Sequence, residues 1–292
     1  MGAVSPRSLS RVGSPGALET LIVERRDGVV TVTMHRPAKK NAANETMWAE
    51  LRATFEDVAG RAEDRVLVLT GAGGDFCSGA DLSGRGGPGE AARGAGAGRT
   101  VDDGTTRDAT PLGRMRRVNA ACIALHRIPQ PTIAKVRGVA VGAGCNLALG
   151  CDLVVASEGA RLSEIFARRG LSLDFGGSWV LPRRVGLHRA NELAFLADLV
   201  GAADAAAMGL VNRVVPDAEL DAFVDGWARR LAAGPPIALA ATKRLLQASL
   251  ASSLEEALEA EAAAQVTNFG TADTAEAMAA FLEKRDPKFT GR

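Results

Sequence analysis

Alternating apolar and polar positions begin the patterned part of the chain. Over residues 29–34, Val30, Val32 and Met34 alternate with threonines, which predicts a half-buried strand. An apolar segment at 21–23 precedes it, and the intervening Asp27-Gly28 is typical of a hairpin turn. The pattern then changes to helical spacing up to Gly60, with one apolar face made of Met47, Leu51, Phe55 and Val58.

Short apolar runs and helical spacing alternate along the rest of the chain. Further strands are predicted at 65–70, 131–136, 139–141, 152–156 and 211–215. Helices are predicted at 111–128, 190–199, 202–208, 217–232 and 236–250, and from 254 to 284 with a break near Gly270. This order predicts an α/β fold with a layered core, followed by alanine-rich helices.

Two glycine-rich runs each join an apolar segment to a predicted helix start, GAGGDFCSGADL at 71–82 and GVAVGAGCNLALG at 138–150. Their turns carry glycine and alanine, so the chemically useful groups there are backbone N–H groups, which lack intrahelical acceptors at a helix start. Two such amides directed at one point would form an oxyanion hole for a thioester or similar carbonyl. Neither run completes GxGxxG, because Phe76 and Leu147 occupy the third glycine position, and no GxxxxGK[ST] occurs.

Composition excludes several classes of protein. A chain of 292 residues with 47% hydrophobic residues and net charge +1 favours a globular protein with no general attraction to nucleic acid or membrane. No apolar stretch is long enough for a membrane span, and residues 1–16 lack the apolar middle of a secretory signal, so we expect a cytoplasmic protein. Four cysteines and three histidines show no metal-ligand spacing, so we expect no metal site.

The composition also changes along the chain and suggests its organisation. Residues 1–18 are rich in Ser, Gly, Pro and Arg and are expected to be a disordered tail. We expect an α/β core over 19–212 and a helical region over 213–292 that mediates oligomerisation, because its helices have more apolar surface than one core can bury. Residues 83–110 contain almost nothing to bury, and we expect either a mobile wall of the substrate site or a surface linker.

The segments DFCSGADL and GVAVGAGCNLALGCDLVVAS resemble the two signature segments of the enoyl-CoA hydratase/isomerase (crotonase) superfamily, and the similarity extends over nearly all of 20–292. The resemblance implies a spiral of ββα units and an acyl-CoA thioester as substrate, with coenzyme A present only as part of that substrate. By position, the two oxyanion-hole amides would be those of Ala80 and Ala143.

The acidic residues distinguish the reactions that this family performs. Its hydratases use two acids, and the corresponding positions here are Asn146 and Phe166, neither of which ionises. Asp174 instead stands where members with a GLxPDxGG pattern carry an aspartate, which resembles the branch that contains 1,2-epoxyphenylacetyl-CoA isomerases. Leu173 replaces the usual proline. Judged by spacing alone, Asp174 is either a desolvated carboxyl group with a raised pKa or the N-cap of a helix from Ser178.

Three neighbouring polar residues receive secondary interpretations. Asn146 either orients the acyl group or a water molecule, or packs inside its helix. Glu164 is the one nearby acid that could restore a two-carboxylate mechanism, but its position favours an exposed residue at a helix start. Asp81 is expected to cap a helix behind the first amide.

The resemblance also implies where the coenzyme A part of the substrate would bind. The adenine and phosphates would contact the segment HRPAKKNA, the amides near 71–73 and the C-terminal helix of a neighbouring subunit in a homotrimer or hexamer. The residues implied are Lys39, Lys40, Ala42, Gly71, Gly73, Ala80, Asp81, Phe281 and Lys284. For the three lysines, a solvated basic face is the alternative.

The leading hypothesis is an acyl-CoA isomerase that shifts a double bond, or opens an epoxide ring, with Asp174 as acid and base. One alternative is an enoyl-CoA hydratase with a non-standard acid pair, and another is an acyl-CoA-binding member of the family without catalysis. An aspartate at this position is also compatible with nucleophilic dehalogenation of aryl thioesters. A nucleic-acid-binding role is weaker, because the net charge is near zero and only 4% of residues are aromatic.

Overall fold

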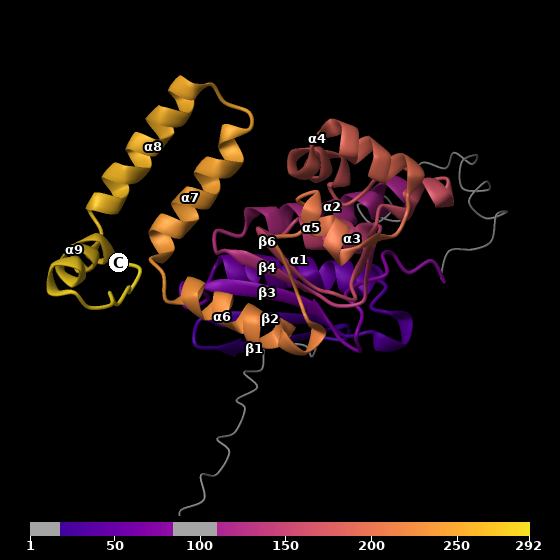
Figure 1. Ribbon diagram of the computed structural model, residues 1–292, viewed down its shortest axis with the longest axis horizontal. Helices are drawn as coiled ribbons and strands as arrows, with labels where there is room; N and C mark the ends of the chain where they lie inside the picture. Colours follow the sequence, from indigo (N-terminus) through magenta and orange to yellow (C-terminus); the bar gives the residue numbers. More distant parts are fainter. Residues whose placement is uncertain (1–17, 84–109) are drawn as a thin grey trace, which may run out of the picture.

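Two sheets form the core of the computed structural model, which describes residues 18–83 and 110–292 (Figure 1). The expected tail and insert therefore lie almost entirely outside the described residues. The larger sheet contains, in spatial order, β1 (Leu21–Arg26), β2 (Val29–Met34), β3 (Val66–Gly71), β4 (Thr132–Val136), β6 (Leu153–Ser157) and β9 (Arg213–Val215). Only β1 is antiparallel to its neighbour, across the turn at Asp27 and Gly28.

The smaller sheet contains β5 (Val139–Val141), β7 (Arg161–Ser163) and β8 (Val200–Gly201). The chain alternates between the sheets, because β4 leads into β5 and β6 leads into β7. Strand β3 is followed in the same way by Cys77, which bridges Ala140 of β5 in parallel. Successive turns of the chain therefore stack beside one another, which confirms the expected spiral of ββα units.

Helices cover both faces of the larger sheet. They are α1 (Glu45–Ala59), α2 (Pro111–Arg127), α3 (Ala143–Leu149), α4 (Gly177–Leu196), α5 (Ala202–Ala207), α6 (Leu220–Ala232), α7 (Pro236–Ser249), α8 (Leu254–Phe269) and α9 (Ala272–Glu283), with short 3₁₀ turns at Pro37–Lys39, Ile165–Arg169 and Asp217–Glu219. Successive side chains of β3 point to opposite faces of the sheet. Leu67 and Leu69 pack on the face covered by α1, α2 and α3, whereas Val66 and Val68 pack on the face covered by α6.

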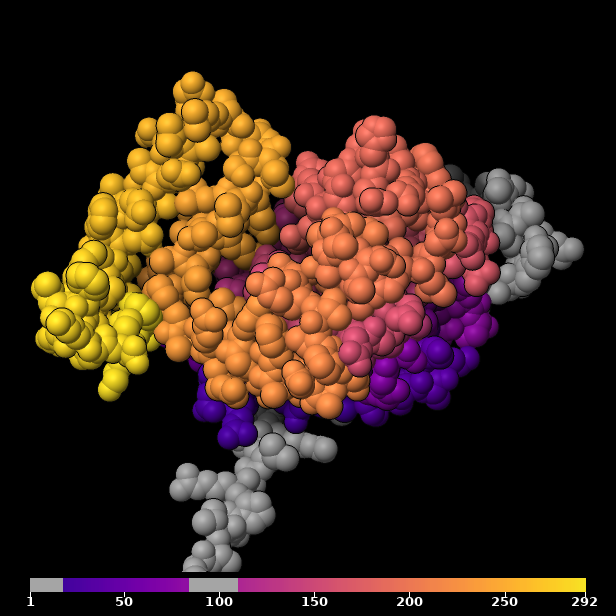
Figure 2. Space-filling model, in the orientation of Figure 1, coloured from indigo at the N-terminus to yellow at the C-terminus, as the bar shows by residue number. Residues whose placement is uncertain are grey.

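The last three helices extend away from the sheets (Figures 1 and 2). Strand β9 and helix α6, which were expected in the C-terminal helical region, instead pack on the sheet, so the projecting part begins at α7. Along these helices large apolar side chains are exposed, among them Leu246, Leu250, Leu254, Leu258, Val266, Phe269, Met278, Phe281 and Leu282. No helix in the described ranges is long and apolar enough to cross a bilayer.

The two glycine-rich runs pack backbone against backbone, and this contact is testable with two glycine substitutions. A methyl group on Gly144 of α3 would lie 2.3 Å from the Cys77 carbonyl oxygen, whereas one on Gly226 of α6 meets nothing within 4 Å. We expect Gly144→Ala to lower the free energy of unfolding by about 1–3 kcal/mol. The control Gly226→Ala should raise it by about 0.5–1 kcal/mol, since alanine is the better helix former. Urea unfolding measures both, and equal stabilities would contradict the close contact.

Candidate active site

The ends of the two glycine-rich runs lie next to each other, as the resemblance implied. Cys77 N–H donates to the Val139 carbonyl (3.0 Å), and Val141 N–H donates to the Cys77 carbonyl (2.9 Å). A methyl group on Gly79 would lie 2.9 Å from the Val141 carbonyl oxygen and 3.9 Å from the Ala143 nitrogen. Only glycine fits this position, whose φ is +99°. The residue after Gly79 is therefore held close to the first residue of α3.

Ala80 and Ala143 each present a backbone N–H without an acceptor among the residues that the structure describes. Ala43 N–H donates to the Gly79 carbonyl (2.8 Å), and Asp81 N–H donates to the Ala43 carbonyl (2.9 Å). In such a parallel bridge the N–H of the intervening residue, Ala80, points to the other side. Ala143 is the first residue of α3 and is 3% exposed. These two amides can stabilise a negatively charged oxygen between them.

The segment that follows β2 also forms hydrogen bonds to the first glycine-rich run, residues 71–82. Two of its residues, Asn41 and Arg36, make these bonds, and the sequence analysis assigned neither of them a role. The Asn41 side chain is fully buried and donates to the carbonyls of Ala72 (2.8 Å) and Asp75 (2.7 Å). It also accepts the Arg36 N–H (2.9 Å). Lys40 and Asn41 both adopt positive φ, +48° and +55°. The local sequence signal for this turn is Asn41, because asparagine tolerates a left-handed backbone conformation better than most residues do.

Arg36 is the second of these residues. Its guanidinium donates to Asp81 (2.8 Å) and to the Ala42 carbonyl. Hydrogen bonds from Ser83, assisted by Arg36, lower the pKa of Asp81 well below its ordinary value. The Asp81 carboxylate accepts the Ser83 N–H (3.0 Å), and the residues into which a helix capped by Asp81 would continue lie outside the described ones.

Most residues that the resemblance assigned to coenzyme A lie where the segment 36–42 packs against the first glycine-rich run, residues 71–82. Lys39 and Lys40 are exposed, and Lys40 forms an ion pair with Asp75 (3.7 Å). Gly73 packs against Pro37, where a methyl group would come within 2.6 Å, and Gly71 turns tightly beneath Asn41. Ala42 and Asp81 are joined to them through Arg36.

Phe281 and Lys284 do not belong to this surface of the same chain. Figure 1 shows α9 among the projecting C-terminal helices, apart from the sheet-containing body in which α3 lies. Phe281 is 80% exposed, and Lys284 follows α9 in a left-handed conformation. One chain alone therefore does not bring these two residues to Ala80 and Ala143.

Asp174 begins a tight turn that leads into α4, because its carbonyl accepts the Gly177 N–H (2.9 Å). Phe175 and Gly176 both adopt positive φ, +46° and +76°. The Phe175 ring is buried against Trp48, with ring centroids 5.1 Å apart, which fixes the turn on its inner side. Gly176, not Asp174, is the N-cap of α4, so the capping interpretation was wrong. The Asp174 side chain itself is half-buried.

Asn146 connects Asp174 to a second acid. It is 1% exposed, and its Nδ2 donates both to the Asp174 carbonyl (2.9 Å) and to Glu164 Oε2 (3.2 Å). Because Asn146 lies one turn after Ala143 on α3, this contact holds the Asp174 backbone about one helical turn from Ala143. Phe166, at the other hydratase position, is buried, and its ring lies 3.6 Å from where a Gly142 methyl group would be.

Glu164 is 3% exposed, so the prediction of an exposed residue was wrong. It directly follows β7, whose parallel pairing with β5 places it at the same sheet edge as Gly142. Burial raises the pKa of Glu164 to about 7, and the charge of Asp174 adds to this, whereas the Cys145 thiol and the Asn146 amide act in the opposite direction. Burial likewise raises the pKa of Cys145 well above its usual range. The only local sequence signal for the burial of Glu164 was the pair of apolar residues that follows it, Ile165 and Phe166.

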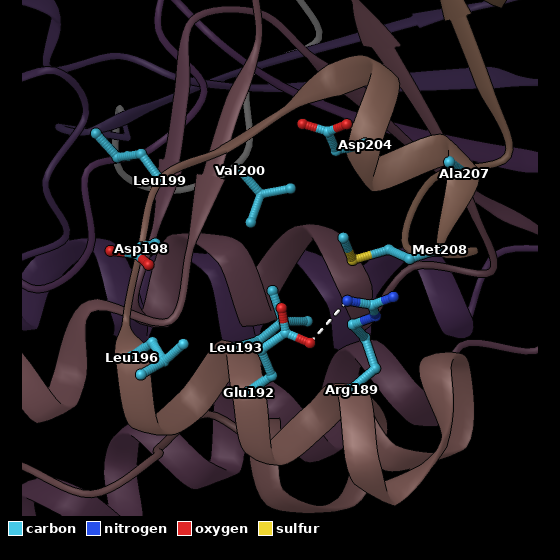
Figure 3. Close-up of a pocket in the computed structure, with 10 residues that line it drawn as sticks. All are labelled: Arg189, Glu192, Leu193, Leu196, Asp198, Leu199, Val200, Asp204, Ala207 and Met208. Atoms are coloured by element: carbon cyan, nitrogen blue, oxygen red, sulfur yellow. Dashed lines mark hydrogen bonds and ion pairs between the residues drawn. The ribbon is translucent and has the colours of Figure 1, made fainter.

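The pocket drawn in Figure 3 lies elsewhere, between α4, the segment 198–200 and α5. It has a volume of about 380 Å³, and none of Ala80, Ala143, Asn146 or Asp174 lines it. Glu192, Asp198 and Asp204 line it beside a single arginine, Arg189, which is paired with Glu192 (2.7 Å). This charge disfavours the phosphates of a coenzyme A ester.

Known proteins resemble this chain in both sequence and fold. A protein from Rhodobacter capsulatus named "Probable enoyl-CoA hydratase" is 39% identical over 273 residues, covering 94% of this chain and 98% of that protein. The 1,2-epoxyphenylacetyl-CoA isomerase of Escherichia coli is 36% identical over 277 residues, covering 94% and 100%. A crystal structure from Streptomyces coelicolor described as a "putative enoyl-CoA hydratase" has a TM-score of 0.85 at 38% identity, covering 99% and 100%.

These similarities extend over almost the whole chain and include the segments that form the site. The sequence model of the Enoyl-CoA hydratase/isomerase family matches residues 24–292. The match thus includes both glycine-rich runs and the Asp174 turn. The chain belongs to the enoyl-CoA hydratase/isomerase family.

Proposed function

We propose that the protein is an acyl-CoA isomerase that moves a double bond, or opens an epoxide ring, next to a thioester. The observation that carries this proposal is the pair of N–H groups of Ala80 and Ala143, beside which Asn146 holds the backbone of one half-buried aspartate. Two convergent amides suit the oxygen of a thioester enolate. One carboxyl group suits a reaction that removes a proton and returns the same proton elsewhere.

The proposed reaction starts from a 3-enoyl thioester. The Asp174 carboxylate removes a proton from C2, and the C–H electron pair delocalises into the thioester carbonyl. The resulting negative oxygen accepts hydrogen bonds from Ala80 and Ala143. The Asp174 carboxyl group then returns the proton to C4, which gives the 2-enoyl thioester and restores the carboxylate. No water or external reductant is consumed.

Burial of the acids supports one reacting carboxyl group. Addition of water needs a second group that reaches the substrate or the water, and the two family positions for such groups hold Asn146 and Phe166. The Glu164 carboxyl group contacts the Asn146 amide, but Glu164 is only 3% exposed. Asp174 is the more accessible of the two carboxyl groups.

Hydration of a 2-enoyl thioester is the second candidate. Two observations favour it: the Rhodobacter capsulatus relative carries a hydratase name, and the pKa of Glu164, raised by burial, would suit a general acid near neutral pH. Product mass separates the two reactions, because hydration adds one water molecule and isomerisation leaves the mass unchanged.

Binding of the coenzyme A part is proposed to involve a second copy of the chain. Lys39 and Lys40 offer exposed positive charges for phosphates. Phe281 and Lys284 belong to the projecting α9 and the residue that follows it, apart from the body that contains the sheets, and the exposed apolar faces of α7–α9 would be covered in a homotrimer or a hexamer.

Replacement of Asp174 tests the proposed acid and base. We expect Asp174→Asn to lower kcat by about 10²- to 10⁴-fold, because the amide cannot accept the C2 proton. The affinity for a coenzyme A ester, measured by calorimetry, should stay near the wild-type value. Asp204→Asn, at an exposed aspartate of α5, is the matched control and should retain full turnover. Wild-type turnover by Asp174→Asn would disprove the assignment.

Removal of the Ala143 N–H tests the oxyanion hole. Ala143 is the first residue of α3, a position where helices accept proline. We expect Ala143→Pro to lower kcat by about 10²- to 10³-fold, the usual effect of losing one oxyanion donor. Ala143→Gly keeps the amide and should remain active, and thermal unfolding of both variants checks that each folds. Equal activity of the two variants would contradict a role for this N–H.

Mixed oligomers test the contribution of a second copy. Phe281→Ala should raise KM, since the phenyl ring is proposed to pack on the adenine of a neighbouring site. When Phe281→Ala and Asp174→Asn chains assemble together, some sites combine an intact Asp174 with an intact α9. Activity at low substrate should then exceed the sum of the separate variants. An activity equal to that sum would show that α9 does not complete a neighbouring site.

A further inference from the structure

Glu164 is a nearly sealed acid whose hydrogen bonding is incomplete. It follows β7 at the sheet edge that carries Gly142, and it is 3% exposed. Its Oε2 accepts from Asn146 Nδ2 (3.2 Å), whereas its Oε1 accepts no hydrogen bond within the described part of the chain. An acid in this position is costly to bury. Packing alone would be served better by an apolar residue.

The Asn146 amide transmits the state of this acid to the reacting residue. One Nδ2 hydrogen goes to Glu164, and the other goes to the Asp174 carbonyl, which also accepts the Gly177 N–H (2.9 Å). Gly177 also packs tightly against the Asn146 side-chain amide, because a methyl group on Gly177 would lie 2.4 Å from Asn146 Nδ2. Any change in the Glu164–Asn146 bond therefore acts on the peptide that carries Asp174.

We propose that Glu164 and Asn146 form a buried clamp that positions Asp174, and that Glu164 is a second ionisable group of the site that never touches the substrate. Glu164 is thus a positioning residue. The inference deepens the proposed function, since the effect on turnover depends on Asp174 being the reacting group.

The sense of the pH dependence follows from the groups around Glu164. Two ionisable neighbours act on it, the Cys145 thiol of α3, which stays neutral, and the Asp174 carboxyl group before α4. An ionised Glu164 accepts a stronger hydrogen bond from Asn146 and increases the proton affinity of Asp174. Turnover should therefore rise as Glu164 loses its proton, in a window around pH 7.

Glu164→Gln is the decisive variant, because glutamine still accepts the Asn146 hydrogen bond but cannot ionise. The wild-type kcat should show a rising limb with apparent pKa near 7, and this limb should be absent in Glu164→Gln. At pH 8 the variant should be slower by about five- to tenfold, the difference between a charged and a neutral acceptor. An unchanged limb in Glu164→Gln would overturn the proposal.

Asn146→Ala breaks the clamp itself. It should lower kcat by about 10²-fold with little change in KM, as expected when a reacting group is misplaced. Ser163→Ala is the matched control, since it removes a neighbouring buried hydrogen bond, from Ser163 Oγ to the Ala197 carbonyl (3.2 Å). It should leave the pH profile unchanged. A wild-type kcat in Asn146→Ala would also overturn the proposal.

Two readouts do not depend on turnover, so they separate failure of this inference from failure of the proposed function. Because the folded-state pKa of Glu164 exceeds its unfolded value, its ionisation lowers stability as the pH rises from about 4.5 to 7. The Tm of Glu164→Gln relative to wild type should therefore increase between pH 5 and pH 8, and a constant difference would refute a titrating Glu164. Amide exchange at Gly177 should accelerate in Asn146→Ala and not in Ser163→Ala, and unchanged exchange would refute the clamp.

Discussion

The close approach of two backbone segments is the constraint on which the rest of the site depends. Gly79 lies against the Val141 carbonyl, and Gly144 lies against the Cys77 carbonyl, at distances that exclude any side chain. The ladder that joins these segments uses the backbone groups of Cys77, Val139 and Val141 and leaves the N–H groups of Ala80 and Ala143 available. A spiral of strand pairs produces this contact, because equivalent turns of successive units stack side by side.

Buried polar side chains position the neighbouring segments that this backbone contact does not hold. Asn41 ties the turn after β2 to the carbonyls of the first run, and Asn146 ties α3 to the peptide of Asp174. Both asparagines are fully or almost fully buried, and each uses its two amide hydrogens on carbonyl or carboxylate oxygens. Such buried amides hold a geometry only when their partners are present, so each also makes the site sensitive to changes in a neighbour.

Local sequence patterns predicted the elements well because their signals are local. The strand 139–141, the helix break near Gly270 and the α/β order all follow from apolar periodicity and glycine or proline placement. The burial of Glu164 was missed because it depends on the pairing of β7 with β5, which no local pattern encodes.

The most direct measurement of the central claim follows the proton itself. A 3-enoyl-CoA carrying two deuterium atoms at C2 would be converted in ordinary water in a single turnover, and the product analysed by mass and by NMR. Our account predicts a 2-enoyl thioester with deuterium at C4, because the Asp174 carboxyl group returns the atom that it removed. A product with a hydroxyl group at C3, or one without deuterium at C4, would contradict transfer by one carboxyl group.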